Sequence, residues 1–434
     1  QRIVVDSRRD GYARSMYAPR LFNHAALVRR AVLRMAVVAL LSCALVACAP
    51  AAESPQSGLT DAEQAASAHP SLVDLWEGSA SFQLDQEDTG LPMGESDTVV
   101  LPDGTFRAYV HASHPSLGVV DQCGDPVPFP GCVVTFTSVD NGRTFAPTPG
   151  SGGAVTCMLP CKSCPCESRR DHIDQQQYPR VTMPALADAG DLEPWLLVYE
   201  YRGSVFMAQS PDGLTWTRTA ELPQTGVWKT WLMPCRNEEA IGPHPYAPDE
   251  YDCLVGSPPG LFVDHTDGHT DGEAETYVFV GLGQNPSAMG CYRGPLGSPP
   301  ALLRKCDHNP LFEGNPAYGP GDETGPAANP HFDFRTISSA DVIRVGGRAY
   351  MFYEGVRGPE AGAAGDTQFT LGLARSVTAA IDGPWETYPG NPILVDLPGN
   401  VGVGHADVLV HEGLTWLYTS LDGEMRSRLL LVWN

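Results

Sequence analysis

Basic residues are scarce in this sequence. It holds 28 Lys and Arg against 51 Asp and Glu, which gives a formal net charge of −23 at pH 7. Proteins that bind nucleic acid or an anionic membrane surface do so through clustered Lys and Arg. The charge therefore argues against nucleic acid as a partner and is compatible with neutral carbohydrate or with cations.

Long helical and membrane-spanning patterns are also missing. We find no amphipathic pattern of a dozen residues, and the apolar run from Met35 to Ala47 has 13 residues, whereas a membrane-spanning helix needs about 20. The run follows an Arg-rich stretch and ends in "LVAC", as a bacterial lipoprotein signal does. The sequence thus predicts a signal with an upstream extension over residues 1–48 and lipid attachment at Cys48. An ordinary secretory signal is the alternative.

The stretch after this signal is poor in residues that a core would bury. Residues 49–75 are rich in Ala, Ser, Pro and Gln, which is typical of a flexible tether. We therefore expect a folded body over residues 76–434, monomeric and held at the extracytoplasmic face of the cell envelope. Its membrane contact is expected to run through the N-terminal lipid alone.

Cysteines fit an oxidising compartment. Of 12 Cys, setting aside Cys43 and Cys48 leaves ten, and an even number outside the cytoplasm predicts disulfides. Four of them crowd "CMLPCKSCPC", from Cys157 to Cys166. Zinc binding is the alternative at this spacing, but no second C-x-x-C or paired His follows at a finger-like distance. We expect disulfides that staple a long loop.

The body repeats one strand pattern five times. Short β-branched and aromatic runs alternate with Gly, Pro, Asn and Asp, as in "ADVIRVGGRAYMFYEG" and again in "HADVLVHEGLTWLYTSLDG". The five groups begin at Asp97, Arg180, Ser257, Asp341 and Asp407. They lie 66 to 84 residues apart, more than the roughly 40–45 residues of a minimal propeller blade. The loops between strands must therefore be long.

Closure of a ring explains why such units repeat. A four-stranded unit cannot bury both faces alone, whereas a closed ring of units buries them and hides the sheet edges. The sequence therefore predicts an all-β, five-bladed β-propeller with long inter-strand loops. The fifth group lacks an outer strand, and "SASFQLD" (Ser79 to Asp85) is predicted to supply it from the N-terminal side.

Two hairpin motifs read as structural. "SVDNGRTF" (Ser138 to Phe145) matches the Asp-box pattern, and "SPDGLTW" (Ser210 to Trp216) is a shorter relative. In such turns the Asp accepts backbone N–H bonds, the Gly takes a positive φ and the aromatic residue packs between blades. Asp140 and Asp212 are therefore not expected to be catalytic.

Acidic residues at the strand ends are the candidate site. Asp97, Asp341 and Asp407 each precede an apolar inner strand, so their side chains should converge at the channel mouth. Glu200 and Glu354 end the second strands, which return to the same rim. Clustered acids raise one another's pKa and cost stability, which suggests that they are used. Turn capping at exposed blade edges is the alternative.

The last two groups resemble a known enzyme family. "ADVIRVGGRAYMFYEG", "GLARS…GPWETYPGNPIL" and "GVGHADVLVHEGLTWLYTS" are similar to the five-bladed family 43 glycoside hydrolases and their relatives. The resemblance covers Gly94 to the C-terminus in architecture and roughly the last 110 residues in recognisable motif. In that family a base, a pKa-tuning Asp and a Glu acid in the funnel hydrolyse a glycosidic bond, and a His lies near the axis.

This resemblance implies roles for named residues. Asp97 matches the position of the base. The acid and tuning roles do not transfer directly from the family, and we expect Glu354 to be the acid and Asp341 to tune its pKa. His405 would be the axial His beside Asp407, both near the substrate. No cofactor is required, and a divalent cation such as calcium is a candidate near His405.

The chain departs from the family pattern in two places. Ser257 stands where an acidic residue would be expected in the third blade, and Asp341 opens the fourth blade where the family tends to carry its Glu. Arg180, Glu200 and Trp228 complete the residues expected to contact a carbohydrate substrate.

Two other functions stay open. A non-catalytic surface propeller that binds glycans or a protein is favoured by the missing acid of the third blade and by the cysteine-rich loop from Cys157 to Asp171. A sialidase is suggested by "YPRV" (Tyr178 to Val181), in which an Arg would bind a substrate carboxylate. A sialidase needs three such Arg, a Tyr–Glu nucleophile pair and usually six blades, and we find neither the further Arg nor a sixth group.

Overall fold

The computed structural model divides the chain into two units, Gln1–Glu63 and Gln64–Asn434. The structure describes residues 68–92, 94–112, 117–127, 131–148, 154–159, 176–184, 193–201, 204–218, 258–265, 274–282, 288–298, 303–314, 333, 336–357, 368–394, 403–421 and 425–434. The predicted signal, Cys48 and residues 49–67 of the predicted tether lie outside these residues. Residues 68–75 of the tether are described, and they include Leu72 and Leu75, which are buried in a short helix. Among the described residues, no helix has the length and apolar character that crossing a membrane requires.

The described strands form five sheets. The first runs in the order β2 (Ser96–Val100), β3 (Phe106–Ala112), β4 (Cys132–Ser138), β5 (Ala146–Pro147). The second runs β6 (Gln177–Thr182), β7 (Trp195–Tyr201), β8 (Ser204–Ser210), β9 (Thr217–Arg218). The third runs β10 (Pro259–Asp264), β11 (Glu275–Leu282), β12 (Ala288–Pro295), β13 (Arg304–Lys305), with β14 (Phe312–Glu313) also paired to β12. The fourth runs β15 (Thr336–Val345), β16 (Arg348–Arg357), β17 (Gln368–Ser376), β18 (Trp385–Thr387).

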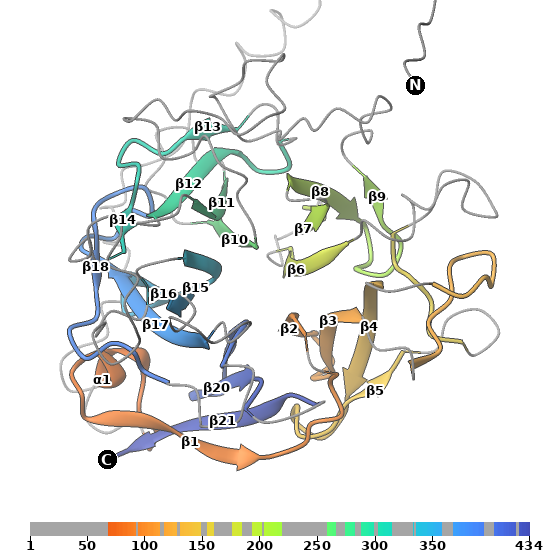
Figure 1. Ribbon diagram of the computed structural model, residues 1–434, viewed down its shortest axis with the longest axis horizontal. Helices are drawn as coiled ribbons and strands as arrows, with labels where there is room; N and C mark the ends of the chain where they lie inside the picture. Colours follow the sequence, from red (N-terminus) through yellow and green to blue (C-terminus); the bar gives the residue numbers. More distant parts are fainter. Residues whose placement is uncertain are drawn as a thin grey trace, which may run out of the picture. The chain divides into compact units, whose positions relative to one another are not determined.

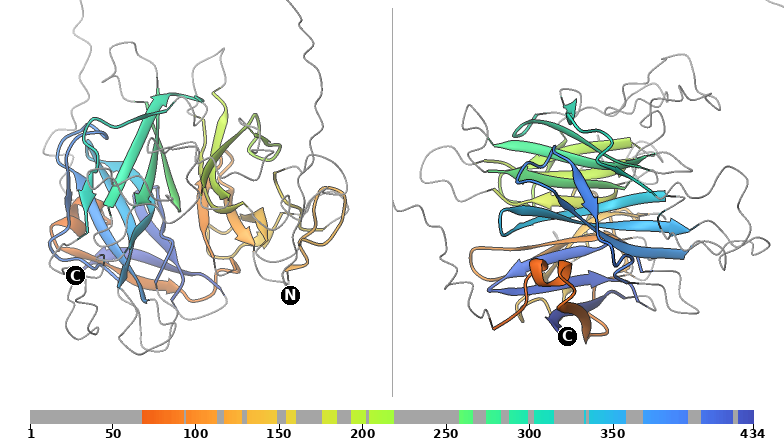
Figure 2. Two further views of the ribbon diagram at one scale, coloured as in Figure 1. Left: turned by 45° about the horizontal axis from the view of Figure 1, so that its top comes forward. Right: turned by 90° about the vertical axis from the view of Figure 1, so that its left-hand side faces the viewer.

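The fifth sheet joins the two ends of the body. It runs β19 (Asp407–His411), β20 (Leu414–Thr419), β21 (Ser427–Trp433) and then β1 (Ala80–Gln86), which pairs antiparallel with β21. The predicted outer strand from the N-terminal side is therefore confirmed. The short helix α1 (Leu72–Trp76) lies beside β1 and the C-terminus (Figure 2).

Five blades surround a common centre. Figure 1 shows the sheets arranged in a ring, with β2, β6, β10 and β15 nearest its middle. The predicted all-β, five-bladed propeller is confirmed. Large side chains from adjacent blades fill the spaces between sheets: Tyr109 of β3 packs at 5.9 Å from the Trp216 ring of the second blade. Phe145 of the first blade packs at 5.8 Å from Tyr418 of the fifth.

The Asp-box turns have the structural role expected of them. Thr144 donates from its N to Asp140 Oδ1 at 2.9 Å and from its Oγ1 to Asp140 Oδ2 at 2.6 Å. Desolvation raises the pKa of Asp140, but hydrogen bonds from Ser138 and Thr144 outweigh it and lower that pKa to about 2. Gly213 in the second box has φ +71°, and a Cβ there would collide with the Tyr109 hydroxyl.

Disulfides are present in the described part of the body. Cys132 bonds to Cys157 and Cys291 bonds to Cys306, and Cys123 is also disulfide-bonded. The remaining cysteines of the run that ends at Cys166 lie outside the described residues.

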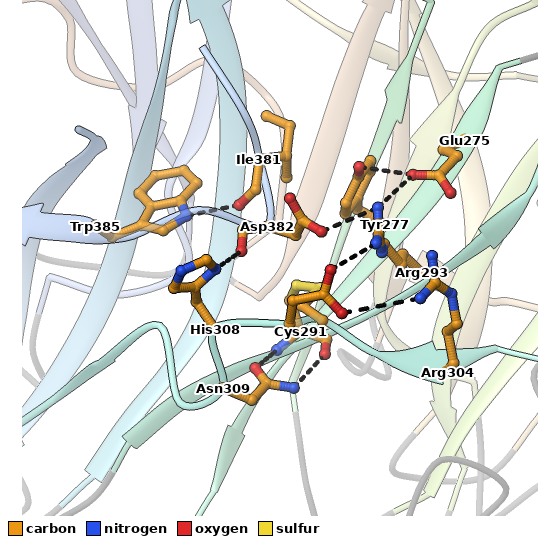
Figure 3. Close-up of a disulfide and its surroundings, with 12 residues drawn as sticks. Glu275, Tyr277, Cys291, Arg293, Arg304, His308, Asn309, Ile381, Asp382 and Trp385 are labelled. Atoms are coloured by element: carbon orange, nitrogen blue, oxygen red, sulfur yellow. Dashed lines mark hydrogen bonds and ion pairs between the residues drawn. A yellow bond between two sulfur atoms is a disulfide. The ribbon is translucent and has the colours of Figure 1, made fainter. Parts of the chain in front are cut away.

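An ionic cluster joins the third and fourth blades beside the second of these disulfides (Figure 3). Arg293 of β12 contacts Glu275 Oε2 at 3.2 Å within its own blade and Asp382 Oδ2 at 2.9 Å in the fourth blade. It also contacts Asp307 Oδ2 at 2.9 Å, and Tyr277 donates its hydroxyl to Glu275. The cluster fixes the outer part of this joint.

A buried ion pair holds β1 to β21 in the fifth sheet, and the same arginine reaches the first blade. Arg428 of β21 donates from Nε to Asp85 Oδ2 of β1 at 2.8 Å and from Nη1 to the Asn141 carbonyl at 2.6 Å. Arg143 reaches the same Asp85 from the surface at 3.3 Å, with 56% of its side chain exposed. Asp85 therefore holds a buried cation and an exposed one.

We expect Asp85→Ala to lower the free energy of unfolding by about 3 kcal/mol, because it leaves the buried Arg428 without its carboxylate. The matched control, Arg143→Ala, should cost less than about 1 kcal/mol, since exposed pairs contribute little. Urea denaturation of both variants measures the difference. Equal losses in the two variants would contradict this account of the joint.

Candidate functional site

Five inner-strand positions are equivalent around the axis. Asp97, Arg180, Gly260, Asp341 and Asp407 each precede three mainly apolar residues of β2, β6, β10, β15 and β19. Each also pairs with the second strand of its blade. The partners are Tyr109, Val198, Phe279, Phe352 and Tyr418 in the same order. We call these five residues the axial ring.

This equivalence corrects one sequence expectation. Ser257 was expected to occupy the third blade's position, but the residue there is Gly260, because β10 begins two residues later than the sequence pattern suggested. A Cβ at Gly260 would lie 2.6 Å from the Ala340 carbonyl of the fourth blade. The third blade therefore approaches its neighbour too closely to carry a side chain at this position. Ser257 itself lies outside the described residues.

The three aspartates of the axial ring bond to the next blade. In each case the donor is a backbone amide of the next blade in the ring. The donor residue is the one that follows that blade's axial residue. The bonds are Val181 N to Asp97 Oδ2, Val408 N to Asp341 Oδ2 at 2.5 Å, and Thr98 N to Asp407 Oδ1 at 3.0 Å. These carboxylates therefore join inner strands across three of the five blade joints.

The same carboxylates converge at the axis, as the sequence predicted. One oxygen from each of Asp97, Asp341 and Asp407 lies within 4.8 Å of the others, and all three residues are buried. Arg180 lies among them, 3.6 Å from Asp97 Oδ1. Its guanidinium donates to the Ala406 carbonyl at 2.8 Å and to Ser339 Oγ at 3.3 Å. One guanidinium thus faces three carboxylates.

Burial and mutual repulsion raise the pKa of two of these acids, Asp97 and Asp341. Burial raises the pKa of Asp97 well above its usual range, Arg180 opposes this, and Asp341 and Asp407 add to it. Burial also raises the pKa of Asp341 to about 6, again against Arg180 and with Asp407 adding. Both carboxyls therefore favour the protonated form more than an ordinary aspartate does.

A second ring lies two residues before the axial ring. Its side chains are Glu95, Tyr178, Ser339 and His405, with Pro258 in the third blade. Three of these residues have left-handed backbones, with φ of 54° at Tyr178, 52° at Ser339 and 55° at His405. Such angles are uncommon outside glycine, cost about 1–3 kcal/mol each and cluster at functional sites. We call these residues the upper ring.

Glu95 is the acidic residue of the upper ring, and it contacts two histidines. Its Oε2 lies 2.8 Å from His111 Nδ1 of β3, and its Oε1 lies 2.8 Å from His405 Nε2 of the fifth blade. Burial raises the pKa of Glu95, but His405 and His111 outweigh it and hold that pKa well below its usual range. Glu95 is therefore ionised although only 5% of it is exposed.

Sequence reasoning missed Glu95. The signal was the repeated tripeptide that ends in the axial residue: "ESD", "YPR", "SAD" and "HAD". His405 lies two residues before Asp407, and Glu95 lies two residues before Asp97. This equivalence places Glu95 in the same ring as His405. His111 was missed as well, because a lone His inside a strand carries no spacing signal.

Glu354 of β16 lies beside the upper ring, near His405. Its Oε2 accepts from Ser338 Oγ at 3.2 Å, and its Oε1 lies 3.8 Å from His405 Nε2. Burial raises the pKa of Glu354, His405 opposes this and Glu95 adds to it. Only 1% of Glu354 is exposed. The pKa of Glu354 is therefore shifted in the direction opposite to that of Glu95.

His405 lies between these two carboxylates. Burial alone would lower its pKa, but Glu354 and Glu95 raise it above its ordinary value. Its Nδ1 lies 3.2 Å from Ser339 Oγ, which also accepts from Arg180. His405 therefore contacts both carboxyls, and the path from Arg180 through Ser339 connects it to the axial ring.

The other expected residues have mixed positions. Glu200 pairs with Gln177 of β6 as Glu354 pairs with Ser338 of β15, so the two glutamates are equivalent, and Glu200 is half-buried. Arg180 is buried and donates to protein groups. Trp228 lies outside the described residues.

A divalent cation does not fit His405 in this arrangement. Nε2 faces Glu95 at 2.8 Å and Nδ1 faces Ser339 at 3.2 Å, so both ring nitrogens already have partners. A His ligand must offer a neutral, unprotonated nitrogen to the metal. Calcium near His405 stays a prediction from the sequence.

Comparisons with known proteins find similar folds. An endo-arabinase from Bacteroides thetaiotaomicron is 12% identical, with 81% of this chain and 97% of that chain covered at a TM-score of 0.44. A thermostable family-43 glycoside hydrolase is 15% identical, with 80% and 92% covered at 0.44. An exo-1,5-alpha-L-arabinanase from a bovine ruminal metagenomic library is 13% identical, with 80% and 94% covered at 0.39.

At these identities and TM-scores the likeness carries no argument about the chemistry of this chain. No family model and no curated protein matches the sequence. The strand pairing described above defines the five blades, and the distances between its side chains define the site.

We expect Asp341→Asn to flatten the dependence of stability on pH. The pKa of Asp341 is about 6 in the folded protein and about 3.9 in an unfolded chain. Between these values the folded state binds more protons, so the free energy of unfolding falls as pH rises from about 4 to about 7. Asn does not titrate and still accepts the Val408 amide through its Oδ1.

The measurement is urea denaturation of both proteins at pH 5 and pH 7.5. The free energy of unfolding of the variant should equal that of wild type at pH 5 and exceed it at pH 7.5. Parallel slopes for the two proteins would mean that Asp341 does not carry a raised pKa.

Proposed function

We propose that this protein hydrolyses glycosidic bonds of oligosaccharides or polysaccharides at the axial funnel. The observation that supports it is the pair Glu95 and Glu354, whose environments push their pKa values in opposite directions on either side of His405. Glycoside hydrolysis needs one carboxyl that is protonated and one that is ionised. Such a split is what assigns acid and base in known enzymes.

The roles follow from these protonation states. Glu354 donates its proton to the leaving oxygen, and the ionised Glu95 activates water or attacks the sugar. His405 stays charged between them and orients both carboxylates. Glu354 keeps the role of acid that the sequence suggested.

Asp97 was expected to be the base, with Asp341 tuning the acid. Glu95 fits the ionised role better, because burial raises the pKa of Asp97 and its Oδ2 already holds the Val181 amide. In the proposal, Asp341 and Asp97 tune the pKa of the acid, Glu354. Arg180 and Ser339 connect the two aspartates to His405, which contacts Glu354.

Non-catalytic glycan binding is the second candidate. The observation that favours it is burial: Glu95 and Glu354 are 5% and 1% exposed, so the carboxyls offer little surface to a reacting bond. A sialidase is less well supported. Arg180 donates to protein carbonyls instead of facing an open site, and burial raises the pKa of Tyr178, so its phenol is not an activated nucleophile.

Glu354→Gln and Glu95→Gln are each expected to lower kcat by about 10²–10⁴-fold, the range of general acid–base catalysis. Initial rates of the full chain on aryl glycosides and on plant and bacterial polysaccharides measure this. Gly404→Ala supplies a charge-neutral control on Glu354, because a Cβ at Gly404 would collide with Glu354 Oε1. It should also lower kcat.

Asp97→Asn separates the two assignments of the base. We expect this variant to keep more turnover than Glu95→Gln. Loss of turnover in Asp97→Asn with normal turnover in Glu95→Gln would return the base to Asp97. Sugar binding by wild type with no turnover on any substrate would favour the glycan-binding candidate.

We further propose that the chain is lipid-anchored through Cys48 at the extracytoplasmic face of a bacterial envelope. The support is the apolar run from Met35 to Ala47 followed by "LVAC". We expect a Cys48→Ser variant to lose incorporation of radiolabelled palmitate and to leave the membrane fraction. Cys43→Ser is the matched control and should keep both. Labelled protein in the Cys48→Ser variant would contradict the proposed anchor.

A further inference from the structure

Tyr178 is the residue of the upper ring that the proposed chemistry does not use. It lies on β6, two residues before Arg180, and is half-buried. Its ring centre lies 5.3 Å from that of His405 and 6.2 Å from that of His111. The aromatic ring is therefore placed beside both imidazoles that hold Glu95.

The phenol group of Tyr178 has no hydrogen bond to any described residue, although its surroundings are polar. Burial raises its pKa, and the carboxylates of Glu95, Glu200 and Glu354 raise it further. The hydroxyl therefore keeps its proton at physiological pH. It remains a donor that the described protein does not use.

Tyr178 has a backbone conformation that is strained for any residue with a side chain. Its φ of 54° is one that glycine adopts freely and that other residues adopt with strain. Ser339 and His405 share this backbone, and their side chains bond to each other at 3.2 Å. Of these three, Tyr178 alone has no hydrogen bond to explain why a side chain is kept there.

We propose that Tyr178 binds the sugar: one face of its ring stacks on a neutral saccharide, and its O–H donates to a sugar hydroxyl. Half-exposed tyrosines combine an apolar face with a polar tip, and ligand sites pair aromatic walls with a few polar groups. A neutral ligand is indicated because three carboxylates surround the phenol. The inference rests on the proposed function only in using the same site, since binding does not require turnover.

The test uses two substitutions that suit a left-handed backbone, Tyr178→Gly and Tyr178→Asn. Binding of cellohexaose, xylohexaose and arabinohexaose to the full chain is measured by titration calorimetry, and KM and kcat are measured on any of these that is hydrolysed. For whichever sugar wild type binds, we expect both variants to raise Kd or KM by about tenfold or more, as lost aromatic stacking and one hydrogen bond would.

Stability separates this role from packing. Tyr178→Gly should keep the melting temperature of wild type or exceed it, because the strain is relieved. A packing role predicts a lower melting temperature with Kd and KM unchanged. Tyr292→Phe is the matched control, because Tyr292 is a buried tyrosine of the third blade, and it should leave binding unchanged.

The outcomes distinguish this inference from the proposed hydrolysis. Wild type that binds a hexasaccharide without cleaving it, with binding weakened in both variants, supports Tyr178 and contradicts hydrolysis. Cleavage with Kd and KM within twofold of wild type in either folded variant overturns the role of Tyr178 and leaves hydrolysis standing. Absence of binding to all three sugars by wild type overturns the proposed neutral ligand.

Discussion

At three joints around the axis, a backbone amide of one blade donates to a buried aspartate of its neighbour. A carboxylate that accepts an amide in a buried setting fixes both the distance and the angle between two inner strands. Because each bond uses the residue next to an axial position, it also aligns the strands in register. The residues two positions earlier must then meet above the axis, although they come from blades hundreds of residues apart.

The second and third blades have no aspartate at the axial position. Arg180 takes the aspartate's place in the second blade and supplies the positive charge that three converging carboxylates require. In the third blade, Gly260 and Gly281 let the strands approach β15 so closely that a Cβ at either would collide with its backbone. The third blade therefore contributes packing without chemistry, and the charged groups come from the other four blades.

Much of this arrangement could be predicted from the sequence. The five repeats, the N-terminal strand that closes the ring, the Asp-box turns and the convergence of Asp97, Asp341 and Asp407 all follow from local patterns with a period. The place of Glu95 in the ring also follows from such a pattern, the residue two positions before Asp97, but its contacts do not, because His111 and His405 reach it from another strand and another blade. Ser257 was placed wrongly because a Pro-rich run hid the start of β10, and glycine in a ring of charged residues gives no signal.

The central claim is that two neighbouring carboxyls on either side of His405 have pKa values shifted in opposite directions, Glu95 downward and Glu354 upward. The most direct measurement is a ¹³C NMR titration of the glutamate side-chain carboxyls in the full chain, with Glu95→Gln and Glu354→Gln used to assign the two signals. The account predicts that the Glu354 signal titrates well above, and the Glu95 signal well below, an ordinary glutamate. Two signals that titrate together near the ordinary value would contradict it.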